Sequence, residues 1–372
     1  LDATIIFVDN TLNQGPMTKL QQFADFTDKE IFVGIDVHKK SWSVSLYYEN
    51  HYLRTFSQPP SADALSKLLR KDYPGANYLC GYESGYSGFW IQRQLLQKGI
   101  NCHVLHAADI PHTHKQKTTK TDTIDSQGIA QALSAGTVHP IYIPDPETES
   151  HRSLIRHRKR VQFDIRRCKN RIRSFLLQFG YVVPERFGDC WSNKFIQWLK
   201  AFDIDQSVTR TTLNHMIEQL ELLRGNFLRV NKDIRQLQRS ERYNPLMPTL
   251  LSVPGVGPLT ALTLITEIAD IKRFGSFRRL NSFVGLYPME YSSGEHEYKG
   301  KITIRSNRYL RELMIEAAWT AIRHDPALLL VFEEWKRRMT AKRAIVKIAH
   351  KLLSRIRYIW LNETTYVKGI VK

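Results

Sequence analysis

Cysteine is scarce in this chain of 372 residues, and its four cysteines are far apart: Cys80, Cys102, Cys168 and Cys190. No two of them form a Cys-x-x-Cys pair, the arrangement typical of structural zinc sites and redox motifs. Small secreted domains held together by disulfides use cysteine far more densely. The sequence therefore argues against a disulfide scaffold and predicts reduced thiols in a cytoplasmic protein.

Long apolar runs and acidic residues are the other two shortages. No stretch approaches the roughly 18 uncharged apolar residues that a transmembrane helix requires, so no membrane span is expected. Asp and Glu number 36 against 54 Lys and Arg, which leaves a formal net charge of +18. An excess of this size predicts a polyanionic partner, and a nucleic acid is favoured over a membrane surface.

Residues 30–145 have the pattern of an α/β domain, and 42% of the whole chain is hydrophobic, enough for the cores of two or three domains. Apolar runs and alternating residues predict five strands, at 31–36, 42–48, 52–56, 77–82 and 102–105. Helices are expected after the third, fourth and fifth strands. Three antiparallel strands followed by parallel crossovers predict a mixed sheet with the first and fourth strands adjacent at its centre. Residues 1–29 form an extension, whose part before Met17 is expected to come from cloning or from upstream translation.

Four acidic residues lie where these elements begin or end. Asp36 lies on the first strand, Glu83 ends the fourth, and Asp122 and Asp125 share the first turn of the last helix. Acids at such places also have an ordinary structural use, because they satisfy free N–H groups and the helix dipole. Four carboxylates gathered at one place repel one another unless cations lie between them, and Mg²⁺ prefers oxygen ligands. We therefore predict that these acids hold Mg²⁺ against a phosphodiester.

The composition becomes strongly basic after Pro144. Residues 151–173 contain ten Lys or Arg against one acid, and apolar residues recur at steps of three and four over 161–179 and again over 213–237. Residues 150–242 are therefore predicted to form a basic coiled-coil segment whose helices pair within or between chains. A solvated face is the ordinary explanation of a charge run, but the one-sided charge favours phosphate contact. The cations concerned are Arg152, Arg156, Arg158, Lys159, Arg160, Arg166, Arg167, Lys169, Arg171 and Arg173, together with Lys115, Lys117 and Lys120 in an earlier loop.

Residues 245–372 are expected to form an all-α domain. The turn around Gly255 and Gly257 resembles a helix-hairpin-helix motif, in which glycines let the backbone approach a phosphate. An ordinary connection between two helices is an equal alternative. A polar loop is expected at 289–294, and Lys299 and Lys301 just after it are further candidates for nucleic-acid contact.

Three segments carry a resemblance to a known family. GIDVHKKSW at 34–42, GYESGYSG at 81–88 and KTDTIDSQGIAQAL at 120–133 resemble the acidic motifs of the DEDD transposases of the insertion-sequence 110/1111 group, relatives of the Piv DNA invertases. The resemblance implies a RuvC-like (RNase H) fold for the first domain and catalytic, metal-binding roles for Asp36, Glu83, Asp122 and Asp125. It also implies a nucleophilic serine in a Ser-Gly pair. By residue match this is Ser293, with Ser292 and Tyr291 as neighbouring alternatives.

The same resemblance implies a function and partners. It implies an RNA-guided recombinase of a mobile element, in the bacterial cytosol or nucleoid, that cuts and rejoins donor and target DNA through a covalent phosphoserine. A structured non-coding guide, the bridge RNA, would pair with both double-stranded DNAs, and four copies of the chain would form a dimer of dimers. Two alternatives stay open: a metal-dependent RuvC-like nuclease that resolves junctions with water, and a nucleic-acid scaffold whose acids are structural.

Overall fold

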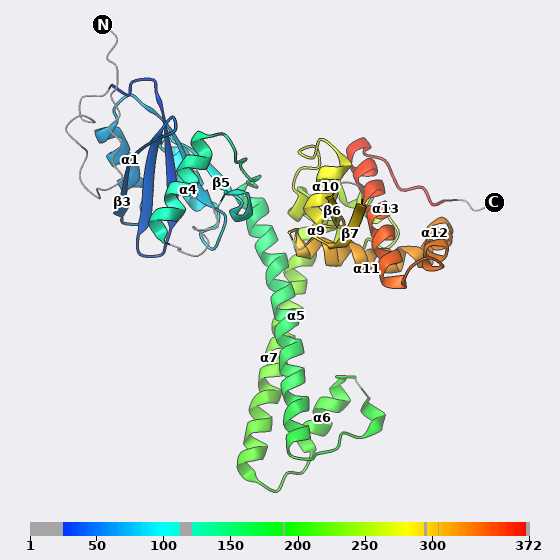
Figure 1. The fold of residues 1–372 in the computed structure, drawn as a ribbon. Coiled ribbons are helices and arrows are strands. Elements are labelled where there is room, and N and C mark those ends of the chain that lie inside the picture. Colours follow the sequence, from blue (N-terminus) through cyan, green and yellow to red (C-terminus); the bar gives the residue numbers. More distant parts are fainter. Residues whose placement is uncertain (1–24, 112–120, 189, 294–295, 304, 370–372) are drawn as a thin grey trace. The chain divides into compact units, whose positions relative to one another are not determined.

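The chain divides into two compact units that meet between Ile143 and Pro144 (Figure 1). The computed structural model describes residues 25–111, 121–188, 190–293, 296–303 and 305–369. The boundary coincides with Pro144, after which the sequence becomes strongly basic. Pro146 is already the first residue of a helix, where its missing N–H costs nothing.

The first unit is a five-stranded mixed sheet flanked by helices. Its elements are β1 (Glu30–Val37), β2 (Trp42–Tyr48), β3 (His51–Gln58), α1 (Ala62–Asp72), β4 (Asn77–Glu83), α2 (Trp90–Gln97), β5 (Asn101–Leu105), η2 (Ala107–Asp109) and α4 (Asp122–Ser134). The strand order is β3-β2-β1-β4-β5. β1 pairs with β2 antiparallel and with β4 parallel. The mixed sheet and the central β1–β4 pair are therefore as the sequence predicted.

The two faces of this sheet are covered by different helices. Ile31, Val33 and Ile35 of β1 lie in one core cluster with side chains of α1 and α2. Phe32 of β1 and Leu79 of β4 instead pack on the cluster that contains Ile129 and Leu133 of α4. Because successive strand residues point to opposite faces, this alternation also decides where the acidic residues of the strands lie.

The end of the N-terminal extension belongs to this unit. Phe26 is buried, with its ring edge-on to Tyr48 and Tyr73, and the N–H of Asp28 donates to the carbonyl of Gly75. Residues 1–24 lie outside the described residues. The sheet domain thus starts at least four residues earlier than residue 30, because an aromatic side chain from the extension fills its core.

The second unit contains two long helices and a helical body. Its elements are α5 (Pro146–Gln178), η3 (Glu185–Phe187), α6 (Asn193–Ala201), α7 (Ser207–Gln238), α8 (Met247–Leu251), α9 (Pro258–Ile268), α10 (Phe277–Val284), β6 (Pro288–Ser293), β7 (His296–Ile302), α11 (Arg308–His324), α12 (Pro326–Lys336) and α13 (Ala341–Asn362). The N-terminal sheet unit is mixed α/β, and this C-terminal region is mainly helical, as expected.

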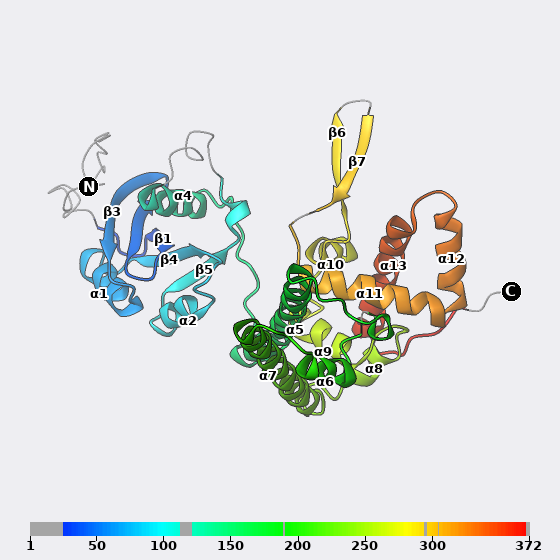
Figure 2. The ribbon, with the colours of Figure 1, turned by 90° about the horizontal axis from the view of Figure 1, so that it is seen from below.

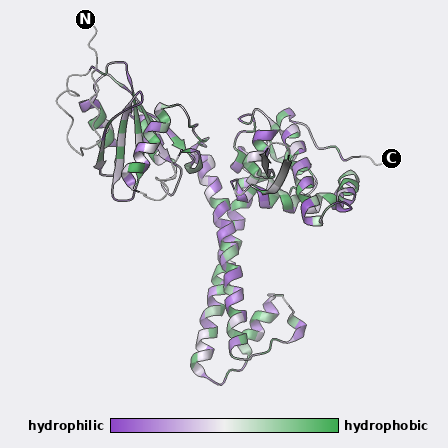
Figure 3. Ribbon diagram, in the orientation of Figure 1, coloured by the Kyte–Doolittle hydropathy of each residue, from purple (hydrophilic) through white to green (hydrophobic). Residues whose placement is uncertain are grey.

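The two apolar seams of the basic segment meet each other within one chain. Cys168 and Ile172 of α5 share a core cluster with Leu213 and Leu220 of α7, and α6 adds Phe195. Figure 3 shows hydrophobic residues interspersed among hydrophilic ones along both long helices, as expected for a narrow buried stripe. The other ends of the long helices enter the C-terminal core, where Ile155 and Val230 are buried. The basic segment and the helical body therefore form one compact unit.

Residues 288–302 depart from the expected polar loop and from a purely helical domain. They form a two-stranded hairpin, β6 and β7, in which Ser292 pairs with Glu297 and Ser293 with His296. Figure 2 shows the hairpin projecting from the helices between α10 and α11. The alternating residues Glu297, Tyr298 and Lys299 carry a weak strand pattern that the many polar side chains concealed. Within the described residues, no helix combines the length and the apolar character needed to cross a membrane.

Candidate active site

The carboxyl ends of β1 and β4 bring two of the predicted acids to one edge of the sheet. Ile35 and Tyr82 are the last paired residues of the parallel β1–β4 ladder, and Asp36 and Glu83 follow them directly. Ile35 and Tyr82 point into the core shared with α1 and α2. Asp36 and Glu83 are therefore on the face that α4 covers.

Two glycines allow α4 to approach this face closely. A Cβ atom placed on Gly34 would lie 2.0 Å from the carbonyl oxygen of Ser126 and 2.5 Å from the nitrogen of Ala130. A Cβ atom on Gly81 would lie 2.7 Å from a methyl carbon of Leu133. A larger residue at Gly34 would meet backbone atoms of α4 and push the helix outward, so Gly34 sets the distance between the acids of α4 and those of the strands. The methyl group of Leu133 opposite Gly81 can instead rotate aside. Neither glycine was predicted to have this role, although a glycine inside a strand is a known signal of close backbone approach.

A buried chain of hydroxyl groups fixes the position of α4 on the sheet. The hydroxyl of Ser126 lies 2.8 Å from that of Ser45 and 3.1 Å from that of Ser43. Ser45 continues to the hydroxyl of Thr55, 2.7 Å away. Ser45 and Ser126 are fully buried, and each contact joins α4 or β2 to the neighbouring element. Such a satisfied network specifies one register of the helix on the strands.

Asp36, His38 and Asp122 form the centre of the site. The Nε2 atom of His38 lies 3.0 Å from a carboxylate oxygen of Asp36 and 3.3 Å from one of Asp122. Among the described residues, these three are the one group of His, Cys, Asp or Glu whose ligand atoms all lie within 4.8 Å of one another. His38 was not among the site residues predicted from the sequence. Its position two residues after a strand-end acid was the available signal.

The electrostatics of Asp36 link it to both acids of α4. Burial raises the pKa of the Asp36 carboxyl above its ordinary value, the nearby His38 opposes the shift, and the charges of Asp122 and Asp125 add to it. Thr121 caps the helix by accepting from the N–H of Ile124, so Asp122 and Asp125 lie in its first turn, as predicted. Three of the four predicted acids are thus electrostatically coupled, and Glu83 lies on the same face of the adjacent strand.

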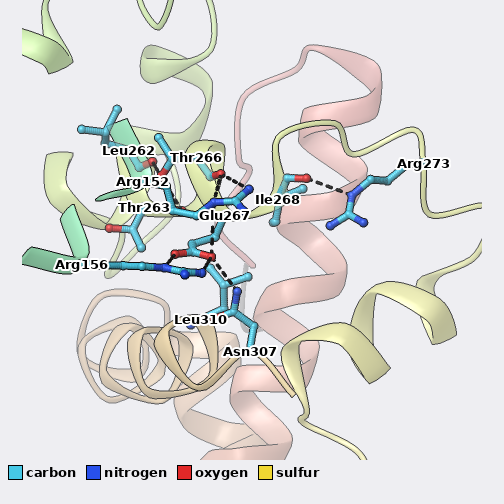
Figure 4. A network of polar contacts seen from close by, with 10 residues as sticks. All are labelled: Arg152, Arg156, Leu262, Thr263, Thr266, Glu267, Ile268, Arg273, Asn307 and Leu310. Carbon is cyan, nitrogen blue, oxygen red and sulfur yellow. Dashed lines mark hydrogen bonds and ion pairs between the residues drawn. The ribbon is translucent and has the colours of Figure 1, made fainter. Parts of the chain in front are cut away.

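Several cations of the basic helix are engaged inside the second unit. Figure 4 shows Arg156 forming two parallel hydrogen bonds with the carboxylate of Glu267, of 2.7 and 2.8 Å. Arg152 lies 3.7 Å from the same carboxylate and donates to the carbonyl of Thr266. The side chain of Glu267 is only 1% exposed, and the amide of Asn307 donates to it over 2.8 Å. Arg152 and Arg156, predicted to contact nucleic acid, therefore join α5 to α9 and to the start of α11.

The next two cations also have partners within the unit. Arg158 donates to the side chain of Asn231 over 2.6 Å and lies above the ring of Phe227. Lys159 pairs with Glu312 at 2.7 Å. Further along α5 the cations face solvent, and those with exposed side chains are Arg160, Arg166, Arg167, Arg171 and Arg173. Lys169 is partly buried, and its amine lies 5.6 Å from the centre of the Trp191 ring. Lys115, Lys117 and Lys120 lie outside the described residues.

The two glycines of the α8–α9 turn differ in what surrounds them. Gly255 has a positive φ of 81°, and an added Cβ would lie 2.1 Å from the carbonyl oxygen of Ala317 in α11. Its primary constraint is thus the packing of the turn against another helix. Gly257 is exposed, has no atoms within 4 Å of an added Cβ, and precedes Pro258 at the first position of α9. Gly257 is therefore the glycine that a phosphate could approach.

The predicted nucleophile lies at the far end of the hairpin. Ser293 is the last residue of β6, and Lys299 and Lys301 lie on β7. The base of the hairpin is held by the N–H of Thr303, which donates to the carbonyl of Tyr287. Asn307 then caps α11 by accepting from the N–H of Leu310. The segment that carries Ser293 is therefore closed at its base by Tyr287 and Thr303, and the α11 cap that follows it is the same Asn307 that contacts Glu267.

Comparison with known proteins identifies the family. A transposase model of the DEDD IS110 type matches residues 33–180, which include all four acids. A second model, for the transposase IS116/IS110/IS902 family, matches residues 247–332, which include the α8–α9 turn and the hairpin. Together the two matches cover more than half of the chain.

Curated relatives agree with these matches. The transposase for insertion sequence element IS1533 of Leptospira borgpetersenii is 25% identical over 302 residues, which are 78% of this chain and 85% of that protein. The transposase for IS1328 of Yersinia enterocolitica is 28% identical over 295 residues, 77% of this chain and 82% of that protein. The transposase for IS1111A of Coxiella burnetii is 29% identical over 212 residues, 56% of each chain. On these findings, the chain belongs to the IS116/IS110/IS902 family of DEDD transposases.

Proposed function

We propose that this protein is an RNA-guided DNA recombinase of an insertion sequence, which breaks and rejoins donor and target strands. The observation that carries the proposal is that ligand atoms of Asp36, His38 and Asp122 lie within 4.8 Å of one another, with Asp125 in the same first turn of α4 as Asp122. An acid with an ordinary structural role does not require two glycines in the sheet that let a helix approach this closely. Carboxylates gathered in this way are typical of sites that act on phosphodiesters.

The residues present fit a divalent cation. Burial raises the pKa of the Asp36 carboxyl above its ordinary value, and the charges of Asp122 and Asp125 add to the shift, so a cation bound beside Asp36 would offset both effects. Asp36, Glu83, Asp122 and Asp125 would hold Mg²⁺, which supplies charge stabilisation to a phosphate under attack. His38 lies between the carboxylates of Asp36 and Asp122, so its side chain would be displaced or would become a ligand when an ion binds.

Ser293 is the proposed nucleophile. Its hydroxyl oxygen would form a bond to the phosphorus of the scissile phosphate while the bond to the departing strand breaks, and that strand leaves as a hydroxyl. The resulting phosphoserine keeps the energy of the ester, so that a hydroxyl of another strand can attack it and free the serine. A serine hydroxyl is a weak nucleophile and needs activation, which is the role assigned to the metal site.

The partners follow from the charge and from the family. The exposed cations of α5, together with Gly257, Lys299 and Lys301, are proposed to contact phosphates of donor DNA, target DNA and a structured bridge RNA. We further propose a tetramer in which the acids of one subunit act with the serine of another. An experiment with the protein, the RNA, Mg²⁺ and labelled donor and target DNA on a denaturing gel tests the mechanism.

The proposal predicts a protein–DNA adduct that is absent in Ser293→Ala and in Asp122→Ala, while Asp122→Ala still binds the RNA. An adduct that survives in Ser293→Ala but is lost in Ser292→Ala or Tyr291→Phe would keep the covalent mechanism and reassign the nucleophile. Cleavage with no adduct would instead support the junction-resolving nuclease that uses water. Failure of every DNA to be cut with Mg²⁺ present would support a scaffold.

A further inference from the structure

Two large aromatic side chains are exposed beside the acidic site. Tyr86 is 67% exposed and Trp90 is 40% exposed, and both follow Glu83 at the end of β4. Large exposed rings are costly in water and are enriched where a protein binds a partner. Neither residue has a role in the chemistry described above, so their exposure asks for a separate explanation.

The Tyr86 ring is fixed at the edge of the acid cluster. Its hydroxyl donates a hydrogen bond of 2.6 Å to the carbonyl oxygen of Val37. Val37 lies between Asp36 and His38 in the chain, so the phenol is tied to the backbone that carries both residues. A ring held at one end by its hydroxyl presents its faces without the loss of rotational freedom that a mobile side chain would suffer on binding.

Trp90 contacts the strand residue that pairs with Val37. Val37 pairs across the hairpin with Trp42, and the rings of Trp42 and Trp90 lie 6.0 Å apart between their centres. Trp42 is fully buried, so it gives Trp90 a rigid support. Tyr86 and Trp90 are therefore attached to the two partners of one strand pair, at the end of β1 where the acids converge.

Basic residues lie in the turn that follows Val37, whose carbonyl holds Tyr86. His38, Lys39 and Lys40 are exposed in the tight turn between β1 and β2, which is closed by the N–H of His38 donating to the carbonyl of Ser41. Aromatic faces next to positive charge are the combination with which proteins bind single-stranded nucleic acid, since bases stack on the rings and phosphates approach the cations. A protein surface partner would not need this combination so close to a phosphodiester site.

We propose that Tyr86, supported by Trp90, stacks an unpaired base of the DNA strand whose phosphate is processed at Asp36 and Asp122. The inference rests on the proposed function and deepens it. The enzyme would bind one base of a locally opened duplex and thereby hold the scissile phosphate next to the acids. The strand is assigned to DNA because the adjoining acids act on DNA. Tyr86 is therefore a positioning residue, because it contacts the strand but none of the reacting atoms.

The test measures binding of short oligonucleotides to the full chain in Ca²⁺, which replaces Mg²⁺ to suppress cleavage. Oligothymidine is compared with an abasic strand of the same length, which has the same phosphates and no bases. We expect Tyr86→Leu to weaken oligothymidine binding about 5- to 150-fold, which corresponds to the loss of one base–aromatic stacking contact. Its affinity for the abasic strand should stay within about 2-fold of the wild-type value. Tyr86→Phe should retain most of the base-dependent affinity. The matched control is Tyr358→Leu on α13, where the tyrosine is 64% exposed.

Equal weakening of both strands by Tyr86→Leu, or no weakening of either, would overturn the inference. Tighter Tyr86-dependent binding of oligouridine than of oligothymidine would overturn the assignment to DNA. If the wild-type protein exchanges strands but Tyr86→Leu does not selectively weaken oligothymidine binding, this inference alone is refuted. If Tyr86→Leu selectively weakens oligothymidine binding but the wild-type protein never cuts or exchanges strands, the proposed function alone is refuted.

Discussion

Replacing Gly34 with alanine should disturb the active site by displacing α4 from the sheet. Gly34 lies in the central strand β1, and its backbone requires no conformation that alanine cannot adopt. The added Cβ would nevertheless lie 2.0 Å from the carbonyl oxygen of Ser126 and 2.5 Å from the nitrogen of Ala130. Both are backbone atoms of α4, so no side-chain rotation can relieve the contact. The helix as a whole has to move away from the sheet.

The size of the effect follows from these distances. An ordinary carbon contact begins at 3.4 Å, so α4 must retreat by about 1.4 Å at Ser126. Forcing an extra methyl group into a packed core typically costs about 1–3 kcal/mol of folding free energy. Because Asp122 and Asp125 move with α4, their distance from Asp36 grows by a similar amount. Misplacement of catalytic groups by about 1 Å can reduce a rate about 100-fold, so we expect a loss of that order in strand exchange.

Two measurements check this expectation. Urea unfolding followed by circular dichroism gives the change in stability, and hydrogen exchange of residues 122–134 reports whether α4 has loosened. The matched control is Gly225→Ala in the middle of α7, where an added Cβ meets nothing within 4 Å. There we expect a gain of about 0.5–1 kcal/mol, since alanine restricts the unfolded chain and favours the helix. A Gly34→Ala protein with wild-type stability and wild-type strand exchange would refute the reasoning.

The other predictions concern charge. Glu267→Ala leaves two arginines without their buried partner and should cost about 3–5 kcal/mol, whereas Glu312→Ala, which breaks an exposed pair, should cost at most about 1 kcal/mol; equal unfolding midpoints in urea would contradict this. Although burial acts to raise it, bonds from Thr148 and the charge of Arg242 lower the pKa of Asp145 to about 2. Its stabilising effect should therefore be complete above about pH 4 and disappear toward pH 2, so the stability difference between wild type and Asp145→Asn should vanish over that interval. Since burial and neighbouring acids raise the pKa of Asp36, Asp36→Asn should stabilise the metal-free protein at neutral pH and abolish stabilisation by Mg²⁺; a thermal shift with Mg²⁺ as large as in wild type would count against the metal site.

Much of the first unit could be predicted because its signals are local. The apolar alternation of residues 31–48, the Ser61 cap of α1 and the Thr121 cap of α4 each determine an element from a few neighbouring residues. The rule that elements consecutive in sequence are usually neighbours in space then predicts the order of the strands. The acids could be found for the same reason, since each stands at the end of an element.

Prediction was less successful where a residue's partner is distant in sequence. Arg152 and Arg156 looked like phosphate ligands because ten cations stand together, and nothing local indicates that Glu267, more than 100 residues later, is buried against them. Gly255 likewise looked like a phosphate-binding glycine, but its close neighbour is the carbonyl of Ala317. The hairpin at 288–302 escaped detection because most of its side chains are polar, so no apolar face marks it.

The sequence by itself determined most of the elements of the first unit and their order in the sheet, and it singled out four acids at element ends, because hydrophobic periodicity and capping act within a few residues. Only the tertiary structure decided which groups meet. It placed His38 between Asp36 and Asp122, let α4 approach through Gly34 and Gly81, and tied Tyr86 to the backbone beside the acids. These contacts depend on close packing between segments that are up to about 90 residues apart, and close packing is a property of the assembled fold rather than of any local pattern.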